Sequence, residues 1–303
     1  MENEVLVGIG DLHGHYIALQ QILESLNRRH NIFSEQNILK EGIKLVFTGD
    51  YIDRGEQGLK IIERIRELQE RNPEKIKTLF GNHELLALAG LDTLKKAGGS
   101  MEYYRYTSAH GGNGGDAFIM EFGLTKEEAF TNYLARMSRE GDIGKWMRAL
   151  EPGTLENICN RRILFVHGGV PPKIKSLTEV DSELKKITQH IQTPTVSFRN
   201  SQEKYLGSEI IGAKSLFWDR RFPDMDDDEA IKATNELGID YIVIGHTPSR
   251  DGLMRAYGKK IFNIDIGMTP RYGGNDPGAI VINQEGIFAS YYKKGEKQIV
   301  SFS

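Results

Sequence analysis

Short apolar runs alternate with helical stripes along the first third of the chain. Two stripes, Tyr16–Asn27 and Leu59–Leu68, repeat apolar residues at the spacing of an amphipathic helix, and Glu84–Leu91 begins another helical pattern. The runs between them have the length of buried strands and are Val5–Ile9, Lys44–Thr48 and Lys75–Phe80. Strands that alternate with helices predict a largely parallel sheet, so we expect an α/β fold.

The middle of the chain loses this alternation. Helical patterns at Lys126–Met137 and Gly144–Leu150 follow a glycine-rich stretch, Gly111–Gly115. That stretch lacks the GK[ST] ending and the strand-before, helix-after context of a phosphate-binding loop, so we interpret it as a flexible hinge. We therefore expect a single domain spanning residues 1–303, into which residues 91–160 are inserted as a mostly helical cap.

Regular order returns after this insertion. Helices are predicted over Leu177–His190 and Asp228–Leu237, with a polar stretch at 193–208 between them. The strand patterns are Arg162–Val166, Tyr241–Gly245, Lys260–Asp265, Ala279–Asn283 and Ile287–Tyr292. The last two flank turn residues and so predict a hairpin.

The composition is that of an ordinary globular protein, and it narrows the class of partner. There are 39 lysines and arginines against 42 acidic residues, a formal net charge of −3. A non-specific nucleic-acid binder normally has a basic face, so we do not expect duplex nucleic acid as a partner. No apolar run approaches the roughly 20 residues of a membrane span, so we expect no membrane association. Cys159 is the only cysteine, which excludes an internal disulfide and favours a reducing, cytoplasmic setting. The sequence does not indicate an oligomeric state.

Glycine flanks Asp, Asn or His at the ends of five predicted strands. The segments are Gly10-Asp11-Leu12-His13-Gly14, Gly49-Asp50-Tyr51-Ile52-Asp53-Arg54-Gly55, Gly81-Asn82-His83-Glu84, His167-Gly168-Gly169 and Gly245-His246-Thr247. In an open α/β sheet, ligands bind outside the carboxyl ends of the strands, so we expect these side chains in one crevice. Glycine permits tight turns and close backbone approach there.

Carboxylates, imidazoles and an amide oxygen suit manganese, iron, zinc, cobalt or nickel, and the absence of thiolates argues against a structural zinc site. The ligand count is too large for one catalytic ion and fits two ions that share a bridging carboxylate. Two divalent ions with two aspartates leave a positive site, which should attract phosphate and lower the pKa of bound water. We expect two divalent metal ions as cofactors, with manganese as the first candidate.

The motifs GDxHG, GDxxDRG, GNHE, HGG and GHT, in this order, resemble those of the phosphoprotein phosphatase branch of the calcineurin-like metallophosphoesterases. The resemblance covers Val5–Pro172 discontinuously and then residues 216 to about 282. It implies a four-layer sandwich in which two mixed β-sheets are flanked by helices, with metals at one edge. It also implies hydrolysis of phosphate esters by a dimetal-bound hydroxide.

The resemblance implies a role for each matching residue. Asp50 would bridge the two metals, and the full ligand set would be Asp11, His13, Asp50, Asn82, His167 and His246. His83 would protonate the leaving-group oxygen, and Asp53 would orient and charge His83. Arg54 would bind the phosphate with its guanidinium fork. A second phosphate-binding arginine is expected in the segment FWDRR, where we favour Arg220 over Arg221.

Three functions remain open on this resemblance. The forms GDYIDRG and GNHE favour a bacterial-type serine/threonine protein phosphatase acting on phosphoproteins, and the long gap between His83 and His167 is similar to that of Shewanella-like phosphatases. Gly245–Pro248 and Asn263–Gly267 look more like bacterial bis(5'-nucleosyl)-tetraphosphatases, whose substrate is a nucleotide. A catalytically inactive binding scaffold would lack a ligand or the acid, and none is missing.

The remaining histidines fit helix surfaces or loops and are His15, His30, His110 and His190. His110 is a secondary candidate for contacting substrate, because it precedes the glycine-rich stretch and caps often supply such contacts. Residues 103–106, Tyr-Tyr-Arg-Tyr, could stack a base, although such clusters more often pack a cap against its body.

Overall fold

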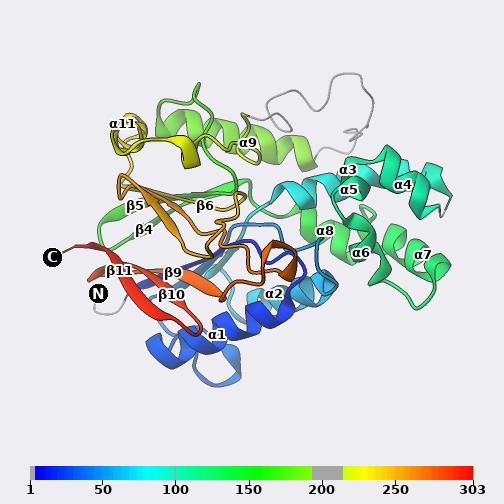
Figure 1. The fold of residues 1–303 in the computed structure, drawn as a ribbon, viewed down its shortest axis with the longest axis horizontal. Helices are drawn as coiled ribbons and strands as arrows, with labels where there is room; N and C mark the ends of the chain where they lie inside the picture. Colours follow the sequence, from blue (N-terminus) through cyan, green and yellow to red (C-terminus); the bar gives the residue numbers. More distant parts are fainter. Residues whose placement is uncertain (1–3, 99, 193–213, 303) are drawn as a thin grey trace.

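The apolar runs of the sequence form two mixed β-sheets that pack face to face (Figure 1). They are seen in a computed structural model, which describes residues 4–98, 100–192 and 214–302. The polar stretch at 193–208 lies outside the described residues. The strands are β1 Val5–Ile9, β2 Ile43–Phe47, β3 Ile76–Thr78, β4 Gly153–Ile158, β5 Arg161–Val166, β6 Tyr241–Ile244, β7 Arg255–Tyr257, β8 Ile261–Asn263, β9 Gly278–Asn283, β10 Gly286–Tyr291 and β11 Gly295–Ser301.

Each sheet combines parallel and antiparallel pairs. The first has the order β11-β10-β9-β1-β2-β3, in which β1, β2 and β3 are parallel and β9 joins β1 antiparallel. The second has the order β4-β5-β6-β8-β7, in which β5, β6 and β8 are parallel. The parallel strands therefore end at a common edge within each sheet, where the glycine-flanked motifs follow them.

Helices cover the outer faces of both sheets, with α1 and α2 beside the first sheet and α9 and α11 beside the second (Figure 1). The helices are α1 Tyr16–His30, α2 Gly58–Arg71, α3 Asn82–Ala97, α4 Met101–Thr107, α5 Ala109–Gly112, α6 Gly115–Met120, α7 Lys126–Met137, α8 Asp142–Arg148, α9 Leu177–Gln192 and α11 Asp227–Leu237, with short 3-10 turns at Glu35–Asn37, Phe222–Asp224 and Pro270–Tyr272. The predicted α/β class and layered architecture are confirmed.

Strand β1 shows how the sequence builds these layers. Leu6 belongs to the cluster between the sheets, whereas Val7 and Ile9 belong to the cluster beneath the helices. Gly8 faces the other sheet so closely that a Cβ atom would lie 2.9 Å from the ring of Phe165. The period-2 alternation of a strand thus supplies both cores from one short run.

The region between β3 and β4 is helical, and α3 to α8 extend to one side of the sheets (Figure 1). The division into one domain with an inserted cap stays a prediction, but its boundary needs correction. Gly153–Ile158 lie inside the span predicted as a mostly helical insertion and form β4, which pairs with β5. The end of that span is therefore part of the second sheet.

The strands missing from the sequence prediction are β4, β7 and β11, and each is the edge of a sheet. An edge strand has one neighbour and keeps polar, half-exposed residues, so it lacks the continuous apolar run of a central strand. β11, with the sequence GEKQIVS, has no fully buried residue.

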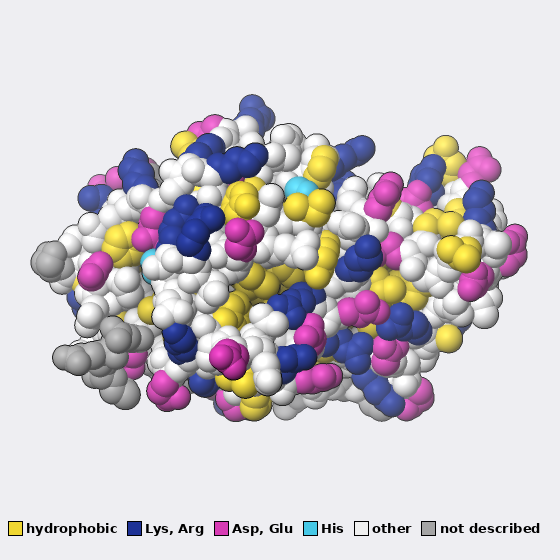
Figure 2. All heavy atoms as spheres, turned by 90° about the horizontal axis from the view of Figure 1, so that it is seen from below, with side chains coloured by type: hydrophobic (Ala, Val, Ile, Leu, Met, Phe, Trp, Pro, Cys, Tyr) yellow, Lys and Arg dark blue, Asp and Glu magenta, His cyan; other side chains and the backbone are white. Residues whose placement is uncertain are grey.

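Acidic and basic side chains are interspersed on the face drawn in Figure 2 and do not gather into one basic field. Among the described residues, no helix is both long and apolar enough to span a membrane.

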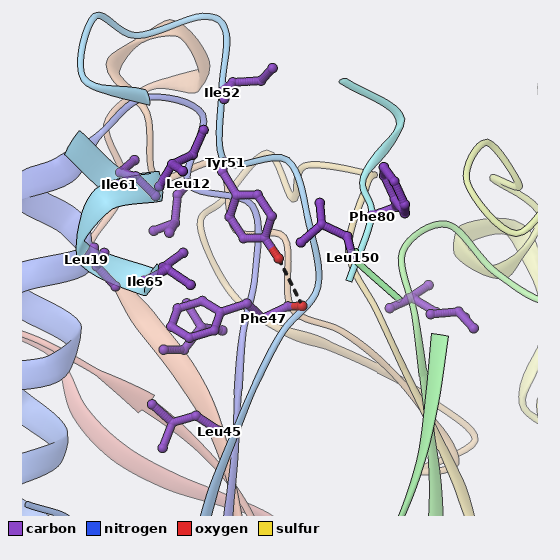
Figure 3. Close-up of a cluster of buried hydrophobic side chains, with 14 of the residues drawn as sticks. Leu12, Leu19, Leu45, Phe47, Tyr51, Ile52, Ile61, Ile65, Phe80 and Leu150 are labelled. Carbon is purple, nitrogen blue, oxygen red and sulfur yellow. Dashed lines mark hydrogen bonds between the residues drawn. The ribbon is translucent and has the colours of Figure 1, made fainter. Parts of the chain in front are cut away.

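Tyr51 belongs to the second motif, and its side chain lies in the core. Figure 3 shows its ring among Leu12, Ile65 and Leu150. The phenol is fully buried and donates a hydrogen bond to the carbonyl oxygen of Leu79 at 2.8 Å. This bond joins the loop after β2 to the end of β3.

We expect Tyr51→Phe to lower the free energy of unfolding by about 1–3 kcal/mol, because it leaves a buried carbonyl oxygen without its donor. Guanidinium denaturation measures the change. Tyr106→Phe is the matched control, since Tyr106 is 81% exposed, and should change stability by less than about 0.5 kcal/mol. Equal effects of the two substitutions would contradict the role of this hydrogen bond.

Candidate active site

The glycine-flanked motifs meet at one edge of the two sheets. The N–H groups of Leu12 and His13 donate to the carbonyl oxygen of Asp50 at 3.1 and 2.9 Å. The N–H of Gly245 donates to the carbonyl oxygen of His167 at 2.7 Å. These bonds join the loop after β1 to that after β2 and the loop after β5 to that after β6. Contacts of His167 with Thr48 and of His246 with Asp11 connect the two sheets, so the crevice expected from the strand ends is a single cluster of side chains.

Asp50 occupies the centre of this cluster. Its Oδ2 atom lies 3.5 Å from Nε2 of His13 and 3.5 Å from Nε2 of His167. Two groups of possible metal ligands share it, one with His13 and His83 and one with His167 and His246. A carboxylate common to two groups is the arrangement expected of a bridge.

Hydrogen bonds orient the imidazoles toward Asp50. Nδ1 of His13 donates to the carbonyl oxygen of Ile52 at 3.1 Å, and Nδ1 of His167 donates to that of Thr48 at 2.8 Å. Each donation fixes the tautomer and leaves Nε2 with a lone pair that faces the cluster.

The resulting donor set fits metal ions. Nε2 of His167 lies 3.0 Å from Oδ1 of Asn82, so two atoms that can each donate an electron pair to a cation lie side by side in the buried cluster. Nε2 of His246 is buried without a hydrogen-bond partner among the described residues. Cations between these atoms would satisfy lone pairs that the protein's own donors do not.

Metal binding requires neutral imidazoles, and the pKa shifts favour the neutral form in two of the three rings. Burial lowers the pKa of His13 to about 4, and burial with the charge of His167 lowers the pKa of His246 well below its usual value. Both rings are then neutral, which is the ligating form. Burial opposes protonation of His167 as well, but the charge of Asp50 raises its pKa overall. A proton and a cation therefore compete for that nitrogen.

Asp11 lies beside the cluster and outside both three-residue groups. Its carboxylate accepts the N–H of His246 at 3.0 Å. A Cβ atom on Gly245 would lie 2.3 Å from Oδ1 of Asp11, so only glycine permits this approach. Burial, followed by the charges of Asp265 and Asp50, raises the pKa of Asp11 well above normal. A nearby cation would favour its ionised form.

His83 and Asp53 form a buried pair. Nδ1 of His83 lies 2.6 Å from Oδ2 of Asp53. Burial would lower the pKa of His83, but the charge of Asp50 and the hydrogen bond and charge of Asp53 raise it overall. Burial would likewise raise the pKa of Asp53, yet His110 and His83 lower it to about 2. The pair can therefore hold a proton on His83 beside an ionised carboxylate.

The arginines differ in what they contact. Nη2 of Arg54 donates to Oδ1 of Asn113 at 3.3 Å, and its Nε is buried without a hydrogen-bond partner in the described part of the chain. Arg220 is exposed and lies 3.4 Å from the hydroxyl of Thr247. Arg221 binds the carboxylate of Asp219 through Nε and Nη2. Arg221 is therefore held in an ion pair with the buried Asp219.

Left-handed backbone marks the motif residues, since His13, Asp50, Asp53, Arg54 and His246 have φ values of 42°, 54°, 67°, 67° and 69°. Such conformations cost on the order of 1–3 kcal/mol each and persist only where the surroundings impose them. Seven further non-glycine residues in the described part of the chain, including Asn31 and Lys259, also have positive φ, so this strain accompanies the site and is not confined to it.

Glu84 imposes part of this geometry, and the sequence analysis gave it no role. Its buried carboxylate accepts N–H groups from Asp50, Tyr51 and Gly81, each at 2.9 Å. The fourth residue of GNHE thus holds the second motif against the third. Its position three residues into helix α3 was the available signal, since acidic residues are common there.

The prediction that His110 lies on a surface or in a loop is wrong. The residue is buried, and its Nε2 lies 2.9 Å from Oδ1 of Asp53. The glycine-rich stretch around it is not an open loop either, because most of it belongs to α5 and α6. Of the neighbouring tyrosines, Tyr104 is buried, whereas Tyr103 and Tyr106 are exposed.

Comparison with known proteins shows that one family model matches most of the chain. The family model described as calcineurin-like phosphoesterase matches residues 5–250. The chain is 25% identical over 309 residues to Shewanella-like protein phosphatase 2 of Arabidopsis thaliana, covering 93% of this chain and 76% of that protein. It is 35% identical over 88 residues to the symmetrical bis(5'-nucleosyl)-tetraphosphatase of Haemophilus ducreyi, covering 29% of this chain and 27% of that protein.

A solved structure of similar fold is the cold-active protein-tyrosine phosphatase of a psychrophilic Shewanella species. The two structures superpose with a TM-score of 0.69 and 18% sequence identity, covering 98% of this chain and 80% of the other. At this identity the comparison shows a common fold.

We expect Asp50→Asn to lower the metal content and abolish phosphate-ester hydrolysis, because it removes the charge shared by the two candidate ligand groups. Mass spectrometry of the metals retained after manganese loading and desalting measures the first effect. Glu156→Gln is the control, a buried carboxylate paired with Lys44 and outside the cluster. Normal metal content and turnover in Asp50→Asn would rule out a bridging role.

Proposed function

The chain belongs to the calcineurin-like phosphoesterase family, and from this premise we propose that it is a metal-dependent protein phosphatase acting on phosphoserine or phosphothreonine. The observation that carries the proposal is the position of Asp50. It lies between two groups of candidate ligands, one of which includes His83 with its partner Asp53. The candidate metal ligands and the proposed proton donor His83 thus lie next to one another around Asp50.

The family implies a two-metal centre, and the proposed ligands are Asp11, His13, Asp50, Asn82, His167 and His246. Two bound divalent ions would supply Lewis acidity toward phosphate oxygens and an activated water. Manganese is the proposed metal. A cytoplasmic setting, favoured by the single cysteine, is also part of the proposal.

The other side chains of the site would bind the phosphate and transfer the proton. Arg54 and Arg220 would hold the phosphate oxygens and set the phosphorus in line with the leaving group. His83 would give its proton to the leaving oxygen as the P–O bond breaks. Asp53 would stay ionised, keeping Nδ1 of His83 protonated and the other ring nitrogen directed at the substrate.

A nucleotide hydrolase is the second candidate. The local identity to the Haemophilus ducreyi tetraphosphatase favours it, but the matched segment covers only 29% of this chain. The similarity to the Arabidopsis phosphatase covers 93% of this chain and supports the hypothesis of a protein phosphatase.

The substrate class is tested by comparing kcat/KM of one manganese-loaded preparation on matched substrates. We expect the largest value for a phosphothreonine peptide, with the same peptide carrying phosphotyrosine and diadenosine tetraphosphate both lower. A higher value for phosphotyrosine would retain a protein phosphatase and change the residue that it recognises. A higher value for the dinucleotide would replace the proposal with the second candidate.

We expect His83→Asn to reduce kcat by about 10²–10⁴-fold on a phosphothreonine peptide, the range that general-acid catalysis contributes. The loss on an activated aryl phosphate should be smaller, because that leaving group needs no proton. Metal content should stay normal. If both substrates lose activity equally, His83 is not the general acid.

A further inference from the structure

Asp53 holds two imidazoles, one on each carboxylate oxygen. His83 binds Oδ2 through Nδ1 at 2.6 Å, and His110 binds Oδ1 through Nε2 at 2.9 Å. All three side chains are buried, and Asp53 and His110 have no exposed side-chain area. The pair with His83 belongs to the proposed mechanism, whereas His110 comes from α5, 57 residues after Asp53 in the chain.

A tyrosine contacts the other ring nitrogen of His110, Nδ1. The hydroxyl of Tyr104 lies 2.7 Å from Nδ1 of His110, and Tyr104 is fully buried. Burial raises the pKa of the Tyr104 phenol, which therefore keeps its proton and can donate it to Nδ1 of His110. Nε2 of His110 then carries the hydrogen that the carboxylate of Asp53 accepts.

Two glycines set the place of these rings. A Cβ atom on Gly115 would lie 2.4 Å from ring atoms of His110, and a Cβ atom on Gly90 would lie 2.3 Å from the hydroxyl oxygen of Tyr104. Neither ring could remain in place beside a larger residue. The close fit prevents His110 from turning away from Asp53.

The same segment also reaches the next residue of the motif. Asn113, at the end of α5, accepts a hydrogen bond from Arg54. Asp53 and Arg54 both have φ of 67°, a conformation that their surroundings must impose. The helical segment therefore braces two consecutive strained residues, one proposed for proton transfer and one for phosphate binding.

We propose that His110 is a positioning residue for hydrolysis, holding one oxygen of Asp53 so that the other stays directed at His83. A carboxylate anchored at one oxygen can rotate about its Cβ–Cγ bond, whereas one anchored at both cannot. The inference rests on the proposed function, because it requires His83 to be the general acid.

The test measures kcat on a series of substituted phenyl phosphates whose phenols differ in acidity. Proton donation matters most for the least acidic phenols. Loss of it therefore makes log kcat fall more steeply with increasing pKa of the leaving phenol, and this dependence is the slope that is compared. We expect His110→Ala to lower kcat on the poorest leaving group by about 10–100-fold, the usual effect of losing such an outer partner. KM and metal content should stay near wild type, and the slope should move toward that of His83→Asn.

His110→Gln is the conservative variant, since its amide N–H can reach the same oxygen. It should recover most of the lost rate and the wild-type slope. Tyr104→Phe keeps the volume, frees Nδ1 and should show a smaller change in the same direction. His30→Ala is the control, because His30 pairs with Glu296 away from the site and its loss should leave the slope unchanged. His110→Gln and Tyr104→Phe keep the test decisive if His110→Ala does not fold.

Two negative results are distinguishable. If His83→Asn steepens the slope but His110→Ala and Tyr104→Phe lower all rates equally, the role of His110 is purely structural and the inference is wrong. If His83→Asn itself leaves the slope unchanged, the general-acid assignment fails and this inference fails with it.

Discussion

The burial of several carboxylates at one edge of the sheets is the constraint on which the rest of the structure depends. Asp11, Asp50, Asp53 and Glu84 are each at most 2% exposed. A carboxylate removed from water is strongly destabilising unless other groups replace the water. Backbone N–H groups do so for Glu84, and imidazoles do so for Asp53. Oδ1 of Asp50 accepts the N–H of His83, but Oδ2 lies between the Nε2 atoms of two imidazoles, where a cation would be its natural partner.

This constraint explains why the fold and much of the site could be predicted from the sequence. Central strands leave continuous apolar runs, and parallel strands bring their carboxyl ends together. Aspartate, asparagine and histidine beside glycine at those ends therefore indicate one cluster before any contact is known. The hydrogen bond from the N–H of His246 to Asp11, between residues 235 apart in the chain, is an example of such convergence.

The parts that could not be predicted depend on contacts that leave no local pattern. The edge strands β4, β7 and β11 have polar or short sequences, and their pairing is decided by the strands beside them. From the sequence, His110 is predicted to be a loop residue because glycines follow it. Those glycines make room for a buried ring, and only the folded chain shows that the ring faces Asp53.

The contact between α5 and Asp53 also limits which segments could replace the helical region between β3 and β4. A surface insertion that only shaped a substrate groove could be lengthened, trimmed or exchanged with little effect on the chemistry. Here the inserted helices complete the hydrogen bonding of a buried carboxylate. Under the proposed mechanism, a chimera carrying a foreign insertion must bring a hydrogen-bond donor to the same oxygen, or the positioning of His83 as proton donor is impaired. A segment exchanged to alter substrate selectivity would then alter proton delivery as well.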